Sequence, residues 1–175
     1  EDNGFASVAI RPHRFLIPNE RSFEQQRVVN LCVSALQKGS SVVAHTAIGT
    51  DDPRIDLVRK SASESSMIDH KTGHILGDAL GEIALQVVRL SDARRLVVAG
   101  GDTAGRIQGH LGVEALQVAR PIGIAAPLCY VYSRKPEIAG VEVAFKGGQI
   151  GTVNYFGRAR NALTPEFEEA ALGRI

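Results

Sequence analysis

Two glycine-rich segments follow short apolar runs and carry residue types that can bind phosphate. The first reads VVAGGDTAGRIQGHLG (97–112), and its candidate residues are Gly100, Gly101, Asp102, Thr103 and Gly105. Glycines let the backbone approach an anion closely, and the N–H groups at a helix start lack partners within the helix. This pattern predicts a phosphate cradle at a strand-to-helix turn. The alternative is a tight turn in which Asp102 or Thr103 caps the helix and nothing binds.

Neither standard phosphate-binding motif is complete in this segment. Gly100 and Gly105 have P-loop spacing, but Arg106 and Ile107 stand where that motif has Lys and then Ser or Thr. The P-loop lysine and its magnesium-binding hydroxyl are therefore missing. The dinucleotide pattern G-x-G-x-x-G does not fit either.

The second segment, VEVAFKGGQIG (141–151), again runs from an apolar stretch into glycines. Lys146, Gly147 and Gly148 offer an ammonium group and flexible backbone, which suit a nucleotide phosphate or base edge. The alternative is a hairpin turn with an exposed lysine. Two such loops in one domain favour a shared site, provided that they meet in space.

A third segment, HTAIGTDDPRI (45–55), contains two adjacent acids. Asp51 and Asp52 could hold Mg²⁺ through oxygen ligands. Adjacent acids before a proline are more typical of a turn or a helix cap. His70 and His74 are four residues apart, but Thr72 and Gly73 disfavour a shared helical face, so no metal ligand is assigned.

Composition limits the class of protein. The chain has 175 residues and a formal net charge of +1, so charge favours neither a nucleic acid nor an anionic membrane as partner. Cys32 and Cys129 lie in apolar stretches, which is typical of free thiols in a reducing compartment. The polar start EDNG and the lack of a long apolar run predict a cytoplasmic protein without a membrane span. The sequence leaves a homo-oligomer open.

The elements that must position these segments can be predicted from hydrophobic periodicity. Strands are expected near 5–10, 42–47, 95–100, 115–119, 128–132 and 141–145, and helices near 22–39, 74–90 and 103–111 and from Thr164 onward. Ser22 and Gln25 have capping-box spacing, and Gly39 suits a left-handed helix end. Residues 53–66 fit a mobile connection or a weak helix equally well. The alternation predicts one α/β domain over 1–175, with a mostly parallel central sheet flanked by helices and extra short strands in the C-terminal third.

The glycine loops together resemble the C-terminal nucleotide-binding domain of the four-carbon acid sugar kinases. The resemblance rests on LVVAGGDTAG, LGVEALQV and VAFKGGQIG, and extends to HTAIGTDDPRI. It implies a two-domain kinase whose N-terminal α/β domain binds an acid sugar such as threonate or erythronate. It also implies that ATP, with Mg²⁺, binds the present domain and that phosphoryl transfer occurs between the domains. By this resemblance, Gly100, Gly101, Asp102 and Thr103 hold the nucleotide phosphates, and Lys146, Gly147 and Gly148 line the same site.

Three departures from the family pattern matter. Ala104 replaces a serine, and Gly147 and Gln149 replace Ser and Asn, which affects polar contacts. The family's domain usually opens with a strand and a Ser/Gly-rich turn that also contacts nucleotide, and we expect this opening segment to precede Glu1. The acid-sugar domain is absent from the sequence. We therefore expect a fragment of a sugar-acid kinase that binds nucleotide weakly by itself and has no activity. The alternative to a fragment is a free-standing domain. For the function, one alternative is a non-catalytic module that senses a nucleotide or sugar phosphate, and another is a purely structural role.

Overall fold

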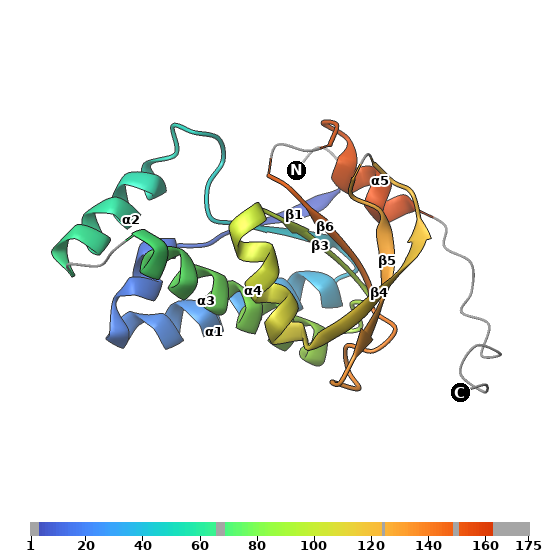
Figure 1. The fold of residues 1–175 in the computed structure, drawn as a ribbon. Coiled ribbons are helices and arrows are strands. Elements are labelled where there is room, and N and C mark those ends of the chain that lie inside the picture. The colour runs from blue at the N-terminus through green and yellow to red at the C-terminus, as the bar shows by residue number, and fades with distance from the viewer. Residues whose placement is uncertain (1–3, 66–68, 124, 149–150, 163–175) are drawn as a thin grey trace.

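The computed structural model describes residues 4–65, 69–123, 125–148 and 151–162 (Figure 1). In chain order the elements are β1 (Phe5–Ala9), the 3-10 helix η1 (Pro12–Leu16), α1 (Pro18–Gln37), β2 (Ser41–His45), α2 (Pro53–Glu64), α3 (Asp69–Leu90), β3 (Arg95–Ala99), α4 (Gly101–Leu111), β4 (Val113–Arg120), β5 (Leu128–Ser133), β6 (Glu142–Lys146) and α5 (Tyr155–Asn161). The helix expected from Thr164 onward lies outside the described residues.

The strands form two hydrogen-bonded sheets. One contains the parallel pair β1–β2, and the other has the order β3-β6-β5-β4. In the second sheet β3 and β6 are parallel, while β5 is antiparallel to both β6 and β4. The α/β class and the additional C-terminal strands are confirmed. The single sheet expected from the sequence is divided, because β2 and β3 do not pair with each other.

Neighbouring residues of a strand point to opposite faces, and this alternation builds two apolar layers around the second sheet. Val98 and Val143 pack with α3 and α4, in a cluster that includes Leu111. Ala144 packs on the other face, with Tyr155 of α5. Figure 1 shows α1, α3 and α4 on one side of the sheets and α5 on the other. The layers hold β3 and β6 between helices.

The first helix begins earlier than the capping-box pattern predicts. α1 starts at Pro18, with Ile17 as the N-cap residue and no side-chain cap. The expected start at Ser22 is therefore wrong. Proline suits the first helical position because its φ angle is already helical and its missing N–H would have no partner there. Gly39, just beyond the helix, has φ +79°, which confirms the expected left-handed end.

The segment that the sequence left open is a helix. α2 covers Pro53–Glu64, and the Asp52 carboxylate accepts a hydrogen bond from the Arg54 backbone N–H. The next helix, α3, is longer than its apolar periodicity indicated and contains Gly73, Gly77 and Gly81. In the described part of the chain, no helix is both long and apolar enough to cross a membrane.

Candidate functional site

The first glycine loop is a direct strand-to-helix turn. Gly100 is the N-cap residue of α4, with φ 137° and ψ 124°. A Cβ at this position would lie 2.8 Å from Thr103 Oγ1, so the turn requires glycine for both its backbone angles and its packing. The expected N-cap at Asp102 or Thr103 is wrong, because the helix begins at Gly101 and both residues lie within its first turn.

The start of α4 is suited to an anion. Gly100 has no side chain that could cap the helix, and the first N–H groups of any helix lack intrahelical partners. These groups also carry the positive end of the helix dipole. Apart from its chain neighbours and the backbone of α4 itself, no described heavy atom lies within 4 Å of a Cβ built on Gly101. A ligand could therefore approach the backbone of Gly101 without meeting a side chain.

The second glycine loop lies directly beside the first. β6 pairs with β3 so that Lys146 is opposite Ala99. The next residue, Gly100, donates its backbone N–H to the Lys146 carbonyl oxygen at 3.0 Å. The two loops, about 45 residues apart in the sequence, are thus joined by a hydrogen bond at the carboxyl ends of adjacent parallel strands. Ligands of open α/β sheets bind at such strand ends.

The Lys146 side chain is buried against the second loop and forms hydrogen bonds with the backbone of the loop. Lys146 is only 8% exposed, and its Nζ donates to the carbonyl oxygens of Gly147 at 2.8 Å and Gly148 at 3.2 Å. The ammonium nitrogen is also 5.7 Å from the centre of the Tyr155 ring. A hairpin turn with an exposed lysine is therefore wrong for this segment. The lysine charge lies under the loop.

The lysine contacts determine how one peptide group of the loop is oriented. In a trans peptide the C=O and N–H groups point in opposite directions. Because the Gly147 carbonyl points at Lys146 Nζ, the N–H of Gly148 points away from it. Apart from its chain neighbours, a Cβ built on Gly148 would meet no described heavy atom within 4 Å. An outward N–H above a buried positive charge is a favourable arrangement for an anion.

Two residues under this loop were not singled out from the sequence. Gly151 has φ 107°, and a Cβ there would lie 3.1 Å from Tyr155 Cδ2 and 3.3 Å from Lys146 Cε. Tyr155 is buried, and its hydroxyl donates to the Ala126 carbonyl oxygen at 2.8 Å. The third glycine of GGQIG was a signal for Gly151, whereas nothing in the sequence pointed to Tyr155.

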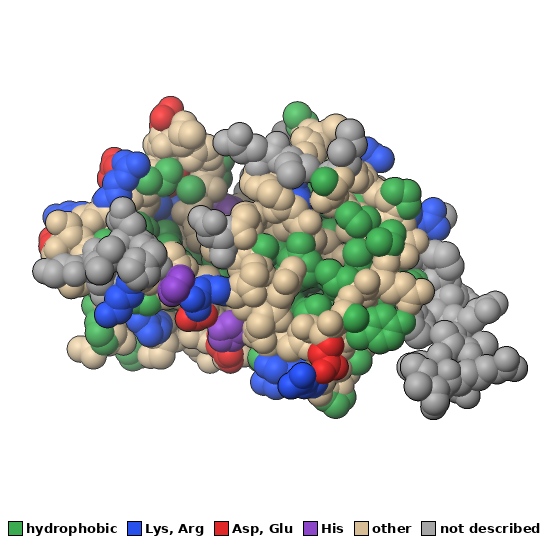
Figure 2. Space-filling view, viewed as in Figure 1, with side chains coloured by type: hydrophobic (Ala, Val, Ile, Leu, Met, Phe, Trp, Pro, Cys, Tyr) green, Lys and Arg blue, Asp and Glu red, His purple; other side chains and the backbone are tan. Residues whose placement is uncertain are grey.

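The residues at the P-loop lysine and hydroxyl positions serve helix packing. Arg106 forms an ion pair of 2.8 Å with Asp78 on α3, and Ile107 is buried in the core. Gly105 lies within α4, where a built Cβ meets no described heavy atom within 4 Å outside its chain neighbours and the backbone of the helix itself. Figure 2 shows basic, acidic and histidine side chains gathered in front of α3 and α4. Arg106 therefore does not replace the missing P-loop lysine in this structure.

The acidic pair of the third segment lies between β2 and α2, directly before the helix. Asp52 accepts hydrogen bonds from the backbone N–H groups of Ile48 and Arg54, and its carboxylate is 2.6 Å from Arg54 Nη2. The hydrogen bond from the Arg54 side chain is the main reason that the pKa of Asp52 lies well below its usual range. Asp52 thus acts as a helix cap. Asp51 is exposed and near Thr50.

Arg54 also contacts His45, the last residue of β2. Arg54 Nη2 is 3.1 Å from His45 Nδ1, and His45 Nε2 is 3.0 Å from Ser7 Oγ. Arginine can only donate, so Nδ1 accepts and neutral His45 carries its proton on Nε2. That proton points to Ser7, so His45 is not placed to act as a base toward this hydroxyl. Burial, and then Arg54, lower the pKa of His45.

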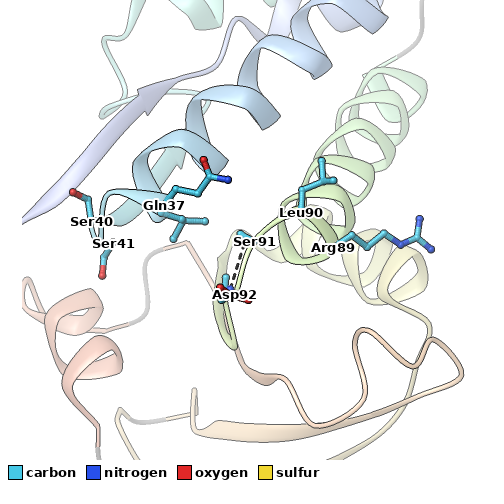
Figure 3. A pocket seen from close by; sticks show the side chains of 10 residues that line it. Gln37, Ser40, Ser41, Arg89, Leu90, Ser91 and Asp92 are labelled. Atoms are coloured by element: carbon cyan, nitrogen blue, oxygen red, sulfur yellow. Dashed lines mark hydrogen bonds between the residues drawn. The ribbon is translucent and has the colours of Figure 1, made fainter.

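Two cavities border the strands. One, of about 560 Å³, lies between β2 and β3 and extends to Thr103 near the first glycine loop. The other, of about 650 Å³, lies at the opposite end of the strands. Figure 3 shows Gln37, Ser40 and Ser41 on one side of it and Leu90, Ser91 and Asp92 on the other; the Arg89 side chain extends away from it. No group of three or more His, Cys, Asp or Glu side chains suited to a metal occurs in the described ranges.

The chain is similar to bacterial sugar-derivative kinases. It is 35% identical over 158 residues to a 3-oxo-isoapionate kinase of Paraburkholderia graminis, covering 90% of this chain and 34% of that protein. It is 28% identical over 137 residues to a 3-oxo-tetronate kinase of Cupriavidus necator, covering 74% of this chain and 31% of the relative. The chain therefore spans about one third of the length of these relatives.

Solved structures share the fold at low sequence identity. A Haemophilus influenzae protein superposes with a TM-score of 0.67 at 15% identity, covering 88% of this chain and 34% of that one. A Bordetella bronchiseptica protein, described as a domain-swapped dimer with bound citrate, gives a TM-score of 0.52 at 15% identity, covering 89% and 40%. These likenesses support the α/β fold.

The family model of the nucleotide-binding C-terminal domain matches residues 1–156, a range that includes both glycine loops. The hydrogen bond between Gly100 and Lys146 joins the two loops into one candidate site. This site agrees with the nucleotide-binding description of the family model and with the kinase names of the relatives. The chain belongs to the C-terminal nucleotide-binding domain family of the four-carbon acid sugar kinases.

Proposed function

We propose that this chain binds ATP and ADP, with Mg²⁺, as the nucleotide-binding part of a longer sugar-acid kinase. The observation that carries this proposal is the hydrogen bond from Gly100 to Lys146, which joins two anion-suited loops. The backbone of Gly100, Gly101, Asp102 and Thr103 would hold phosphate oxygens on one side. Lys146, Gly147 and Gly148 would line the other side.

The residues of the two glycine loops are suited to binding a nucleotide, but they do not form a complete catalytic centre by themselves. Phosphoryl transfer depends mainly on positioning and on neutralising the phosphate charge, and a bound Mg²⁺ shares that neutralisation. The helix start and the buried lysine would supply positive potential, and the glycines would allow close approach. In this proposal the catalytic base and the acid-sugar site belong to the rest of the protein, and the chain alone has no turnover.

The substrate class follows from the relatives. Their names identify 3-oxo-tetronate and 3-oxo-isoapionate as phosphoryl acceptors. We infer that the whole protein phosphorylates a hydroxyl group of a small sugar acid, of the four-carbon type exemplified by threonate, erythronate or their oxidised forms. A non-catalytic nucleotide sensor would share the same loops but would show no turnover in the full-length protein.

A calorimetric titration with ADP, with and without Mg²⁺, tests the nucleotide site. We expect saturable binding to the full-length protein and a loss of at least ten-fold in affinity for Gly101→Val, because its side chain would occupy the open space at the helix start. Gly109→Val is the matched control, since Gly109 is also an exposed, uncrowded glycine of α4.

The two variants distinguish a ligand effect from a folding effect. Both place valine on the same helix, so a general loss of helix stability would weaken binding in both. Equal affinity of Gly101→Val and the unmodified protein would remove the first glycine loop from the site. Binding without phosphorylation of any sugar acid in the full-length protein would favour the sensor.

A further inference from the structure

Tyr155 is a buried contact point between the second glycine loop and the connection from β4 to β5. It is the first residue of α5 and is 3% exposed. A Cβ built on Gly151 would lie 3.1 Å from the Tyr155 ring, and a Cβ built on Gly123 would lie 2.9 Å from it. The backbone of both segments therefore packs against the ring. Because protein interiors are close-packed, the ring cannot shift far without moving one of them.

The connection from β4 to β5 lies at the same edge of the sheet as the two glycine loops. β4 and β6 are both antiparallel to β5, so β4 runs parallel to β6 and to β3. The carboxyl ends of these three strands therefore lie along one edge. The register of β5 on β6 places Cys129 opposite Val143, and its continuation would bring Ala126 opposite Lys146. Tyr155 thus joins two segments of the edge at which we place the nucleotide.

The Tyr155 hydroxyl fixes the ring in this position. It donates a buried hydrogen bond to the Ala126 carbonyl oxygen at 2.8 Å. The preceding residue, Ala125, has φ 56°, a conformation that residues other than glycine seldom adopt. Such a conformation persists only where the surrounding contacts hold it. The hydrogen bond to Ala126 is one of these contacts, so the ring and the β4–β5 connection stabilise each other.

The Lys146 ammonium group is held by uncharged partners. Nζ donates to the carbonyl oxygens of Gly147 and Gly148 and lies 5.7 Å from the centre of the Tyr155 ring. Within the described ranges, no carboxylate forms an ion pair with it. A cation within about 6 Å of a ring centre is attracted to the ring, more strongly when it is desolvated. The ring therefore favours the buried position of the ammonium group, and the positive charge remains available to an anionic ligand.

We propose that Tyr155 is a positioning residue of this site, whose ring holds the Lys146 ammonium group beneath the second glycine loop. The proposal rests on the proposed function, that the site binds ATP and ADP. With the ring in place, Nζ keeps the Gly147 carbonyl turned inward, and the Gly148 N–H is therefore directed outward. Without the ring, the flexible lysine side chain can leave the loop, and the orientation of that N–H is no longer fixed.

Calorimetric titration of the full-length protein with ADP and Mg²⁺ tests this role. We expect Tyr155→Leu, which lacks the ring, to lose about ten-fold or more in affinity. Tyr155→Phe keeps the ring and loses only the hydroxyl, so its affinity should lie within about three-fold of that of the unmodified protein. Its melting temperature should still fall by a few degrees, because the buried Ala126 carbonyl loses its donor.

Leu128→Ala separates positioning from general stability. Leu128 is fully buried and belongs to the same apolar cluster as Tyr155. Its truncation should lower the melting temperature at least as much as Tyr155→Phe does, while the affinity for ADP stays within about two-fold. If Leu128→Ala loses as much affinity as Tyr155→Leu, the loss is an effect of stability and the proposal is wrong.

The titrations also distinguish this inference from the proposed function. Absence of saturable ADP binding by the unmodified protein would overturn the nucleotide site, and the role of Tyr155 with it. Saturable binding that is equally strong in Tyr155→Leu would overturn the role of Tyr155 alone.

Gly123→Ala provides the test if Tyr155→Leu does not fold. The new Cβ would press on the Tyr155 ring from the β4–β5 connection without removing the ring. We expect a several-fold loss of ADP affinity, because the displaced ring no longer supports Lys146. Unchanged affinity in a folded Gly123→Ala protein would contradict the proposal.

Discussion

Gly100 and Gly101 are neighbours but are glycine for different reasons. Gly100 has a backbone conformation that other residues rarely adopt, and Thr103 leaves no room for a Cβ. Gly101 lies at the first position of a helix, where the described protein leaves open space around it. The first glycine is explained by the fold. The second has no packing reason in the described structure, which is why it carries the test of the nucleotide site.

The paired charges of Asp52 and Arg54 predict a pH-dependent contribution to stability. The pKa of Asp52 is lowered in the folded state, first of all by the hydrogen bond from the Arg54 side chain. A lowered folded-state pKa means that the contribution is fully present above the ordinary value of about 3.9 and is lost as the pH falls below it. Asp52→Asn should keep the helix cap but remove this charge effect.

Thermal melting of Asp52→Asn and the unmodified protein between pH 7 and pH 2.5 measures the effect. We expect the unmodified protein to melt at the higher temperature near neutral pH and the difference to narrow below pH about 4. Asp56→Asn is the control, since its ion pair with Arg59 is largely exposed and should contribute little. A difference for Asp52→Asn that does not change with pH would contradict the electrostatic explanation.

At the scale of elements, the glycines of α3 permit close contact with α4. A Cβ on Gly81 would lie 2.6 to 2.8 Å from three atoms of His110, including its Cβ. At Gly77 the nearest atoms belong to the flexible Arg106 side chain, and at Gly73 no described heavy atom outside the neighbouring backbone of α3 lies within 4 Å of a built Cβ. The three glycines are spaced four residues apart, and the space for a Cβ decreases from Gly73 through Gly77 to Gly81 as α3 comes closer to α4.

This difference in space along α3 predicts that an alanine substitution has opposite effects on stability at Gly81 and at Gly73. Gly81→Ala should lower stability by about 1–3 kcal/mol, because His110 cannot move its Cβ without moving α4. Gly73→Ala should raise it by about 0.5–1 kcal/mol, because alanine favours the helix and there is space for it. Chemical denaturation of both variants measures the difference. Equal stability would contradict the close contact of α3 and α4 at Gly81.

The elements themselves were largely predictable from periodicity, whereas their connections were not. The apolar runs located all six described strands, and glycine marked the end of α1. The start of α1 was missed because Pro18 and η1 initiate it without a side-chain cap. The division of the sheet was missed because β2 and β3 read as interior strands in sequence. Pairing between strands depends on contacts that local patterns do not specify.

For the whole molecule, the sequence predicted the two glycine loops but not the hydrogen bond between Gly100 and Lys146 that joins them. Glycine content and the preceding strands made both loops candidates for phosphate binding. Their contact depends on the pairing of β3 with β6, across more than forty residues. The orientation of Lys146 was equally hidden, since a lysine at a strand end is compatible with both an exposed and a buried ammonium. Both the contact between the loops and the orientation of Lys146 depend on strand pairing between residues that are far apart in the sequence.

β2 (SVVAH) and β3 (RLVVA) border one cavity without pairing with each other, and their apolar edges bear on the behaviour of the isolated chain in solution. Open apolar strand edges serve as templates for strands of other molecules. A preparation of residues 1–175 alone should therefore aggregate as its concentration rises, and light scattering would detect this. A preparation that remains dispersed as its concentration rises would contradict this expectation. Solubility would then report whether these two edges are paired.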